Sequence, residues 1–169
     1  MKRASGFTLV EFLLYIAISS ILILVSTTLI TNMLSGKSKL EAVFEVSQNG
    51  RDAMERMRLA IRNANSVSLP ADGTTSTILV LQMPFTSASP TIFMVQNNVI
   101  VMKEGSSASA TLMANDVTVP LLTFHNFGAA NTQDNIRINV TVSSTNPNND
   151  TDYAFGQSFY GSSAVRRKP

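Results

Sequence analysis

The chain has 169 residues, of which 44% are hydrophobic and 14% are charged, and it contains no cysteine. The missing cysteines exclude disulfides, thiolate metal sites and cysteine nucleophiles. The net charge is +2, but Lys2 and Arg3 precede residue 7; the rest of the chain has 11 basic against 11 acidic side chains, so no basic surface indicates nucleic-acid binding.

A long apolar segment follows the basic N-terminus. Residues 7–30 contain one charged side chain, Glu11, among 24 residues. As a helix, this segment would be about 36 Å long, enough to cross a hydrocarbon core of about 30 Å. A carboxylate within such a span is costly. Three interpretations are therefore open: a cleaved secretory signal peptide, a plain membrane anchor, or a segment whose carboxylate finds a partner after processing.

The residues around Glu11 form a specific pattern. In "KRASGFTLVEFLLYIAI", a short basic leader ends in Gly6, Phe7 follows, and a Glu at the fifth position after Gly6 interrupts an apolar run. This pattern resembles the class III signal of type IV pilins and pseudopilins. The resemblance implies cleavage between Gly6 and Phe7 by a prepilin peptidase at the cytoplasmic face of the bacterial inner membrane. It also implies N-methylation of Phe7, a cytoplasmic N-terminus and a periplasmic or extracellular globular domain.

The same resemblance implies a role for Glu11 in assembly. Cleavage creates a cationic amine on Phe7, and the Glu11 carboxylate would pair with the Phe7 amine of a neighbouring subunit. Attraction between opposite charges is strong away from water, and an unpaired buried charge is heavily penalised. The expected salt link between Glu11 and Phe7 would therefore favour one register of the packed helices.

The second part of the predicted helix is amphipathic. No proline occurs before Pro70, and apolar residues from Leu40 to Ile61 recur at spacings of three or four. The pattern predicts one helix from about Thr8 to Ala64, with Gly36 and Gly50 as weak points. The stretch "RDAMERMRLAIRNANSV" looks like the corresponding region of minor pilins and of the J-type minor pseudopilin of type II secretion.

From Pro70 onward, the sequence predicts strands. The predicted strands are 77–83, a hairpin at Asn97-Asn98 within 91–105, 116–127 with a bulge or edge at Pro120, 135–144 and 152–165. We expect an α+β fold, with one antiparallel sheet of five to seven strands packed on the amphipathic half of the long helix. The expected domains are a leader (1–6), a transmembrane and filament-core helix (7–30), an amphipathic helix half (31–66) and a β-rich globular domain (67–169).

Chemically reactive residues are scarce in this region. His125 is the only histidine, so a zinc site or a catalytic triad is not expected, and we interpret His125 as a strand residue. The stretch 146–152 gathers Asn and Asp oxygens that calcium could use, but Asn/Asp clusters usually form turns. We therefore expect no metal, no cofactor and no enzymatic activity.

The expected function is that of a structural subunit, a minor pilin or minor pseudopilin that assembles into a type IV pilus or a type II secretion pseudopilus. The expected partners are other pilin-like subunits, the prepilin peptidase and N-methyltransferase, the inner-membrane assembly platform and, before assembly, membrane lipid. The alternative is a membrane-anchored binding module that captures a ligand or takes up DNA without entering a filament. The sequence does not separate secretion, motility and DNA-uptake filaments.

Overall fold

The computed structural model describes residues 8–114, 116–129, 133–146 and 153–166. One long helix, α1 (Leu9–Asn63), opens the described chain, which confirms the prediction of a single helix from about Thr8 to Ala64. The chain divides into two compact units, residues 1–38 and residues 39–169.

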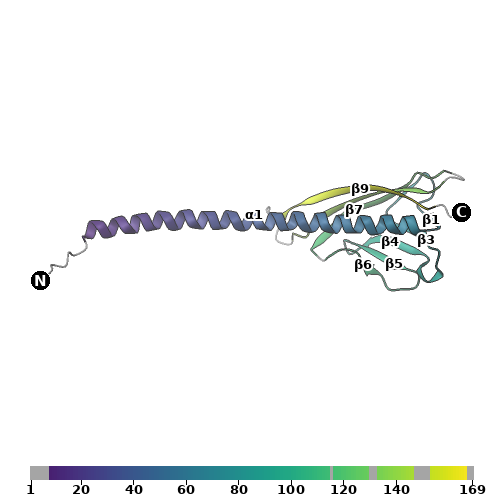
Figure 1. Ribbon diagram of the computed structural model, residues 1–169, viewed down its shortest axis with the longest axis horizontal. Helices are drawn as coiled ribbons and strands as arrows, with labels where there is room; N and C mark the ends of the chain where they lie inside the picture. The colour runs from purple at the N-terminus through teal and green to yellow at the C-terminus, as the bar shows by residue number, and fades with distance from the viewer. Residues whose placement is uncertain (1–7, 115, 130–132, 147–152, 167–169) are drawn as a thin grey trace. The chain divides into compact units, whose positions relative to one another are not determined.

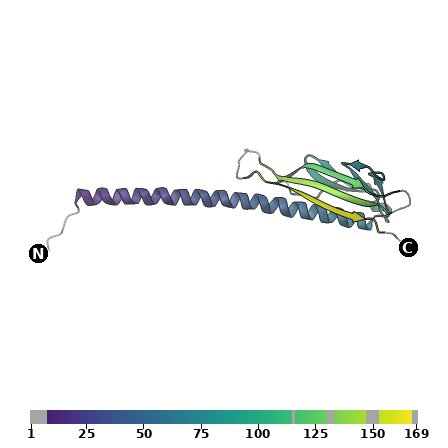
Figure 2. The ribbon, with the colours of Figure 1, turned by 90° about the horizontal axis from the view of Figure 1, so that it is seen from above.

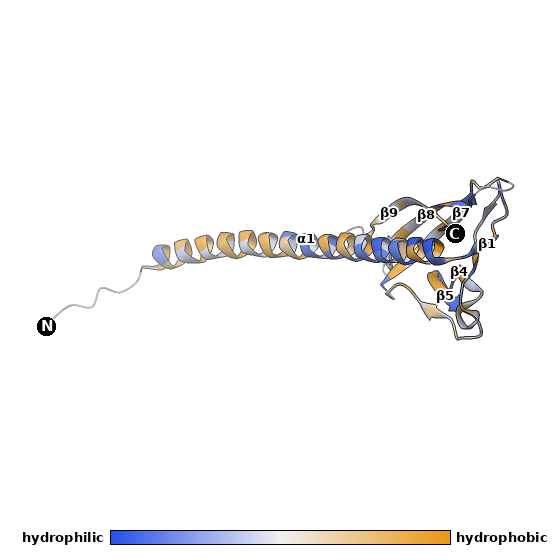
Figure 3. Cartoon of the chain, turned by 45° about the vertical axis from the view of Figure 1, so that its right-hand side comes forward, coloured by the Kyte–Doolittle hydropathy of each residue, from blue (hydrophilic) through white to orange (hydrophobic). Residues whose placement is uncertain are grey.

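The first unit consists of the apolar part of α1, which Figure 3 shows largely in the colour of hydrophobic residues. Its hydroxyl side chains bond back to the helix itself: Ser20 Oγ donates to the Ile16 carbonyl at 2.7 Å, and Ser26 Oγ donates to the Leu22 carbonyl at 2.8 Å. Thr27 and Thr28 make the same bond one turn back. These polar groups are therefore satisfied without water, as a helix in lipid requires.

The second unit combines the rest of α1 with two antiparallel sheets (Figures 1 and 2). The first sheet has the order β1-β3-β4-β5-β6 and is formed by β1 (Ser66–Leu69), β3 (Leu79–Gln82), β4 (Thr91–Gln96), β5 (Val99–Glu104) and β6 (Ala110–Thr111). The second sheet has the order β2-β7-β8-β9 and is formed by β2 (Thr75–Ser76), β7 (Val117–Asn126), β8 (Asn135–Ser144) and β9 (Gly156–Ala164). A short 3-10 helix, η1 (Thr86–Ala88), lies between β3 and β4.

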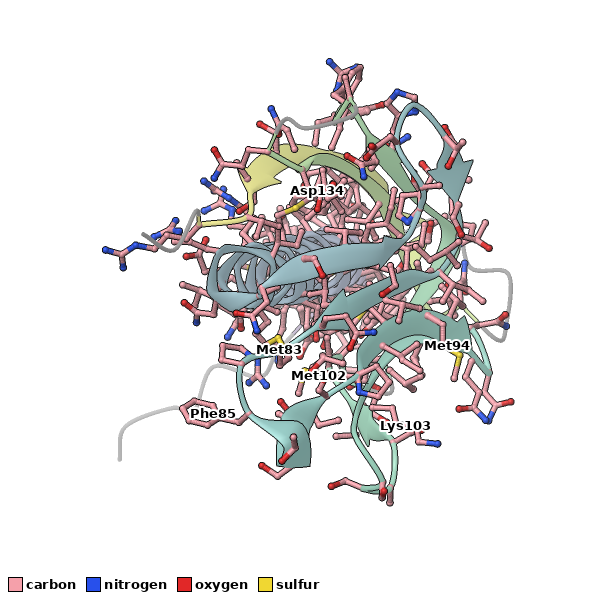
Figure 4. The ribbon with its side chains drawn as sticks, turned by 90° about the vertical axis from the view of Figure 1, so that its right-hand side faces the viewer. Met83, Phe85, Met94, Met102, Lys103 and Asp134 are labelled. Carbon is pink, nitrogen blue, oxygen red and sulfur yellow. The ribbon has the colours of Figure 1, made fainter. Side chains whose placement is uncertain are left out.

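The core of this unit lies where the two sheets cover α1. Figure 4 looks along the helix and shows strands of the two sheets on different sides of it. Val46, Met57 and Ile61 are fully buried on the helix. They pack in one cluster with side chains from the first sheet (Leu79, Leu81, Phe93, Ile100) and from the second (Leu122, Phe124, Ile136, Ile138, Val140, Val142). Each such side chain contributes about 1.5–3 kcal/mol when removed from water.

Local predictions for the β region are confirmed. Asn97 and Asn98 have φ angles of 51° and 62° and join β4 to β5, as the hairpin prediction required. The β7–β8 register shifts between Thr118 and Leu121, so Pro120 lies at the predicted bulge.

The prediction of a single sheet of five to seven strands is wrong, because the described residues form nine strands in two sheets. The alternation of apolar residues shows which face of a strand is buried, but it does not show which strands share a sheet. Three strands, β1, β2 and β6, were not predicted, because they are too short to show an alternating pattern. The fold class stands: a long N-terminal helix packed against C-terminal antiparallel sheets, an α+β arrangement.

Candidate functional site: the start of the long helix

The first turn of α1 is fixed by a side-chain cap. Thr8 Oγ1 accepts a hydrogen bond from the Glu11 main-chain N–H at 3.3 Å, and the Phe12 N–H donates to the Thr8 carbonyl at 3.1 Å. The spacing Thr8-x-x-Glu11 is that of a capping box, in which a Ser or Thr side chain satisfies a free N–H of the first turn. The sequence analysis missed this role of Thr8, although the four-residue pattern was available.

Glu11 itself is exposed and lies in the first turn of the helix. Carboxylates are favoured there because the unpaired N–H groups carry partial positive charge. Within the described stretch of the chain, Glu11 makes no ion pair. Gly6 and Phe7, the expected cleavage and methylation residues, lie outside the described residues, so the structure does not test the expected link between Phe7 and Glu11.

The helix beyond Glu11 presents apolar side chains on every face. From Leu9, which is 77% exposed, to Met33, also 77% exposed, its large hydrophobic residues lie at the surface. They are Leu9, Val10, Phe12, Leu13, Leu14, Tyr15, Ile16, Ile18, Ile21, Leu22, Ile23, Leu24, Val25, Leu29, Ile30 and Met33. The helix is long and apolar enough to cross a membrane, and no part of its apolar window is buried. An apolar surface of this size is unfavourable in water, so we expect either lipid or other apolar helices to cover it.

The residues considered for metal binding do not form a site in the part of the chain that is described. No group of three or more His, Asp or Glu side chains there could hold a metal ion. Of the expected Asn/Asp cluster, Asn146 is described, whereas Asn148, Asn149, Asp150 and Asp152 lie outside the described residues. His125 is a strand residue, as predicted: its Nδ1 lies 2.7 Å from Thr75 Oγ1 on the neighbouring strand, and its ring contacts Phe127 edge-on.

A buried amide at the end of β7 holds the second sheet to the loop before β2. The Asn126 side chain is 1% exposed and donates to the Pro70 carbonyl and to carboxylate oxygens of Asp72 and Asp134. Asp134, labelled in Figure 4, also accepts from the Val67 N–H at 3.1 Å. Each of these contacts satisfies a polar group within the protein, so this cluster has a structural role.

Comparison with known proteins supports the interpretation of the N-terminus as a methylation signal. Residues 1–27 match the family model for the prokaryotic N-terminal methylation motif. The chain carries this motif. No curated protein and no solved structure matches the chain. The motif, the apolar helix and the packed sheets together form a pilin-like arrangement.

Proposed function

We propose that this pilin-like protein is cleaved between Gly6 and Phe7, methylated on Phe7 and then assembled into a type IV pilus or a type II secretion pseudopilus as a minor subunit. The observation that carries the proposal is the methylation motif over residues 1–27, which includes the start of a helix with exposed apolar side chains on all faces. Before assembly, lipid of the inner membrane would cover this helix; afterwards, the helices of other subunits would.

Electrostatics supports a function for Glu11 in the assembly step. In a membrane, the Glu11 carboxylate would lie near the N-terminal end of the apolar segment, where it could reach the polar headgroups of the lipid. Among packed apolar helices it would be removed from water, and the methylated amine of Phe7 on a neighbour would offset that cost. Methylation retains the positive charge of the amine. The prepilin peptidase, other pilin-like subunits and the inner-membrane assembly platform are the partners that this scheme requires.

The assignment as a minor subunit rests on sequence alone. The segment 51–67 is similar to the corresponding region of minor pilins and J-type minor pseudopilins, and the chain has no C-terminal cysteine pair. The choice among secretion, motility and DNA-uptake filaments stays outside this proposal.

The N-terminal mass of the membrane-extracted protein tests the processing step. The protein is produced with and without a co-expressed prepilin peptidase. With the peptidase, we expect the mass to fall by residues 1–6 and to rise by one methyl group on Phe7. Gly6→Val should block cleavage, and Ala4→Val, in the same leader, serves as the control. A chain that keeps its leader beside an active peptidase would contradict the proposal and would favour a plain anchor.

A second experiment tests the role of Glu11. Glu11→Ala should lower incorporation into filaments by at least about tenfold, because it leaves the amine of Phe7 unpaired among the packed helices. Cleavage and membrane insertion should persist. Leu14→Ala removes a similar volume one turn later without removing a charge, so it should incorporate nearly normally. Immunoblots of sheared filaments and of membranes measure both fractions. Normal incorporation of Glu11→Ala would contradict the pairing argument.

A further inference from the structure

The last strand of the second sheet has a free edge. β9 (Gly156–Ala164) pairs with β8 and is the final strand in the order β2-β7-β8-β9. Main-chain bonds from Ser144 N–H to the Phe155 carbonyl and from Val165 N–H to the Asp134 carbonyl flank this pairing. Because antiparallel pairs alternate between bonded and non-bonded positions, the odd-numbered residues of β9 bond to β8. The even-numbered residues, among them Ser158, Tyr160 and Ser162, therefore direct their N–H and C=O groups away from the sheet.

The sequence of β9 itself contains none of the features that normally prevent strand pairing. Edge strands are commonly kept short or interrupted by Lys, Pro or a bulge. The other edge strands of the two described sheets follow this rule: β1 has four residues, and β2 and β6 have two each. In contrast, β9 has nine residues and a regular register with β8, and its sequence GQSFYGSSA contains no charge and no proline.

A groove runs along β9 on the side of α1. Phe159 and Tyr160 line it from the strand, and two cationic, two anionic and one apolar side chain line it from the helix: Arg51, Arg58, Asp52, Glu55 and Met54. Tyr160 is 72% exposed. Phe159 and Gly161 face the helix, where Gly161 lies over Met54 and the aliphatic part of Arg58. A strand added to β9 would lie above this groove, with alternate side chains directed into it.

The groove contains a cationic group without a full set of partners. Arg58 Nε is shielded from solvent and has no hydrogen-bond partner among the described residues. Its only ion pair in that set is a 3.7 Å contact between Nη1 and a Glu55 oxygen. A guanidinium binds a carboxylate best through two N–H groups, and the Arg58 side chain is 42% exposed, so an incoming carboxylate would bind the exposed part of this side chain.

We propose that the free edge of β9 is a docking site for an extended segment of a partner protein, which adds to the sheet as a further strand and places a carboxylate beside Arg58. Main-chain hydrogen bonds would supply affinity, and the alternate side chains directed at the groove would supply specificity. The proposal does not depend on filament assembly, because the strand edge and the groove belong to the globular unit.

Binding of defined peptides to the full chain in detergent micelles tests this site. The probe is a fluorescein-labelled peptide TVTETVT, read by fluorescence anisotropy. One control peptide carries Lys in place of Glu, and another is N-methylated at alternate residues so that one edge loses its donors. We expect saturable binding of the Glu peptide, at least about tenfold weaker binding of the Lys peptide and loss of binding on N-methylation. Amides of Ser158, Tyr160 and Ser162 should exchange hydrogen more slowly in the complex.

Two variants of the protein test whether the peptide binds at β9. Ser162→Pro removes an N–H that points away from β8, so the sheet keeps its own bonds while the edge is blocked. This variant should bind the Glu peptide at least about tenfold more weakly, whereas Ser162→Ala should bind it normally. Arg58→Gln should abolish the preference for Glu over Lys. Absence of binding, equal binding by the N-methylated peptide, or normal binding by a folded Ser162→Pro protein would overturn the proposal.

Discussion

At the residue scale, Glu45 is an acidic side chain whose surroundings disfavour its charged form. It is half-buried on α1, and its Oε2 is shielded and lacks a hydrogen-bond partner among the described residues. Burial first, and then the nearby charges of Asp116 and Glu41, raise the pKa of the Glu45 carboxyl above its usual range. Because the folded state holds this proton more tightly than the unfolded chain does, ionisation of Glu45 costs stability. Stability should therefore fall as pH rises from the unfolded pKa through the folded one.

Glu45→Gln removes that charge and keeps the shape of the side chain. We expect this variant to have a higher thermal midpoint than the parent at pH 7, well above the unfolded pKa of Glu, because it carries no carboxylate to remove from water. The difference should shrink as the pH falls toward about 3, below the unfolded pKa of about 4.3, where the carboxyl is protonated in the folded and the unfolded state. Circular dichroism of the full chain in detergent at both pH values provides the measurement. Glu104→Gln, at the exposed end of β5 and absent from the charges that act on Glu45, is the control. A lower midpoint for Glu45→Gln at pH 7 would show that the carboxylate is stabilised by a partner.

At the scale of elements, the close approach of α1 to β9 depends on Gly50. A Cβ built on Gly50 would lie 2.1 Å from Cε2 of the Phe159 ring. Gly50→Ala would gain about 1 kcal/mol of helix propensity, but it would force the ring out of its place at a cost of about 1–3 kcal/mol. We expect a net loss of stability on denaturant unfolding of the full chain. Gly36→Ala, which meets no atom within 4 Å, should show no loss, and Phe159→Leu should rescue Gly50→Ala. A stabilised Gly50→Ala would mean that the ring moves at little cost.

This contact also shows where prediction from sequence stops. The helix, the hairpin at Asn97-Asn98 and the bulge at Pro120 were predictable because their signals lie in neighbouring residues. Gly50 was recognised only as a weak point of the helix. The reason for it, the ring of Phe159, comes from a strand far along the chain, and the sequence did not show that the strands form two sheets.

At the scale of the whole molecule, the N-terminal processing signal and the free edge of β9 differ in how far the sequence predicts them. The residues expected to direct processing and assembly (Gly6, Phe7 and Glu11) form a linear signal, so they could be named from sequence, although the structure describes only Glu11 of the three. The free edge of β9 could not be predicted, because it exists only once β9 has paired on one side and the groove on the other side has formed. The sequence of β9, GQSFYGSSA, is that of an ordinary surface strand, and it does not show which strands will be its neighbours.

The division into two units leads to a prediction about folding. The buried hydrophobic residues of the described chain begin at Ala42, and residues 8–37 are exposed. The core of the globular unit is therefore complete within residues 39–169. We expect a fragment of these residues to be soluble without detergent, to show the secondary structure of the full chain by circular dichroism and to unfold cooperatively. The same fragment carrying Met57→Ala should be less stable by about 2–5 kcal/mol, since it leaves a cavity where the helix meets both sheets. A fragment that is unfolded or insoluble alone would show that residues 1–38 contribute to folding and do not act only in the membrane or in a filament.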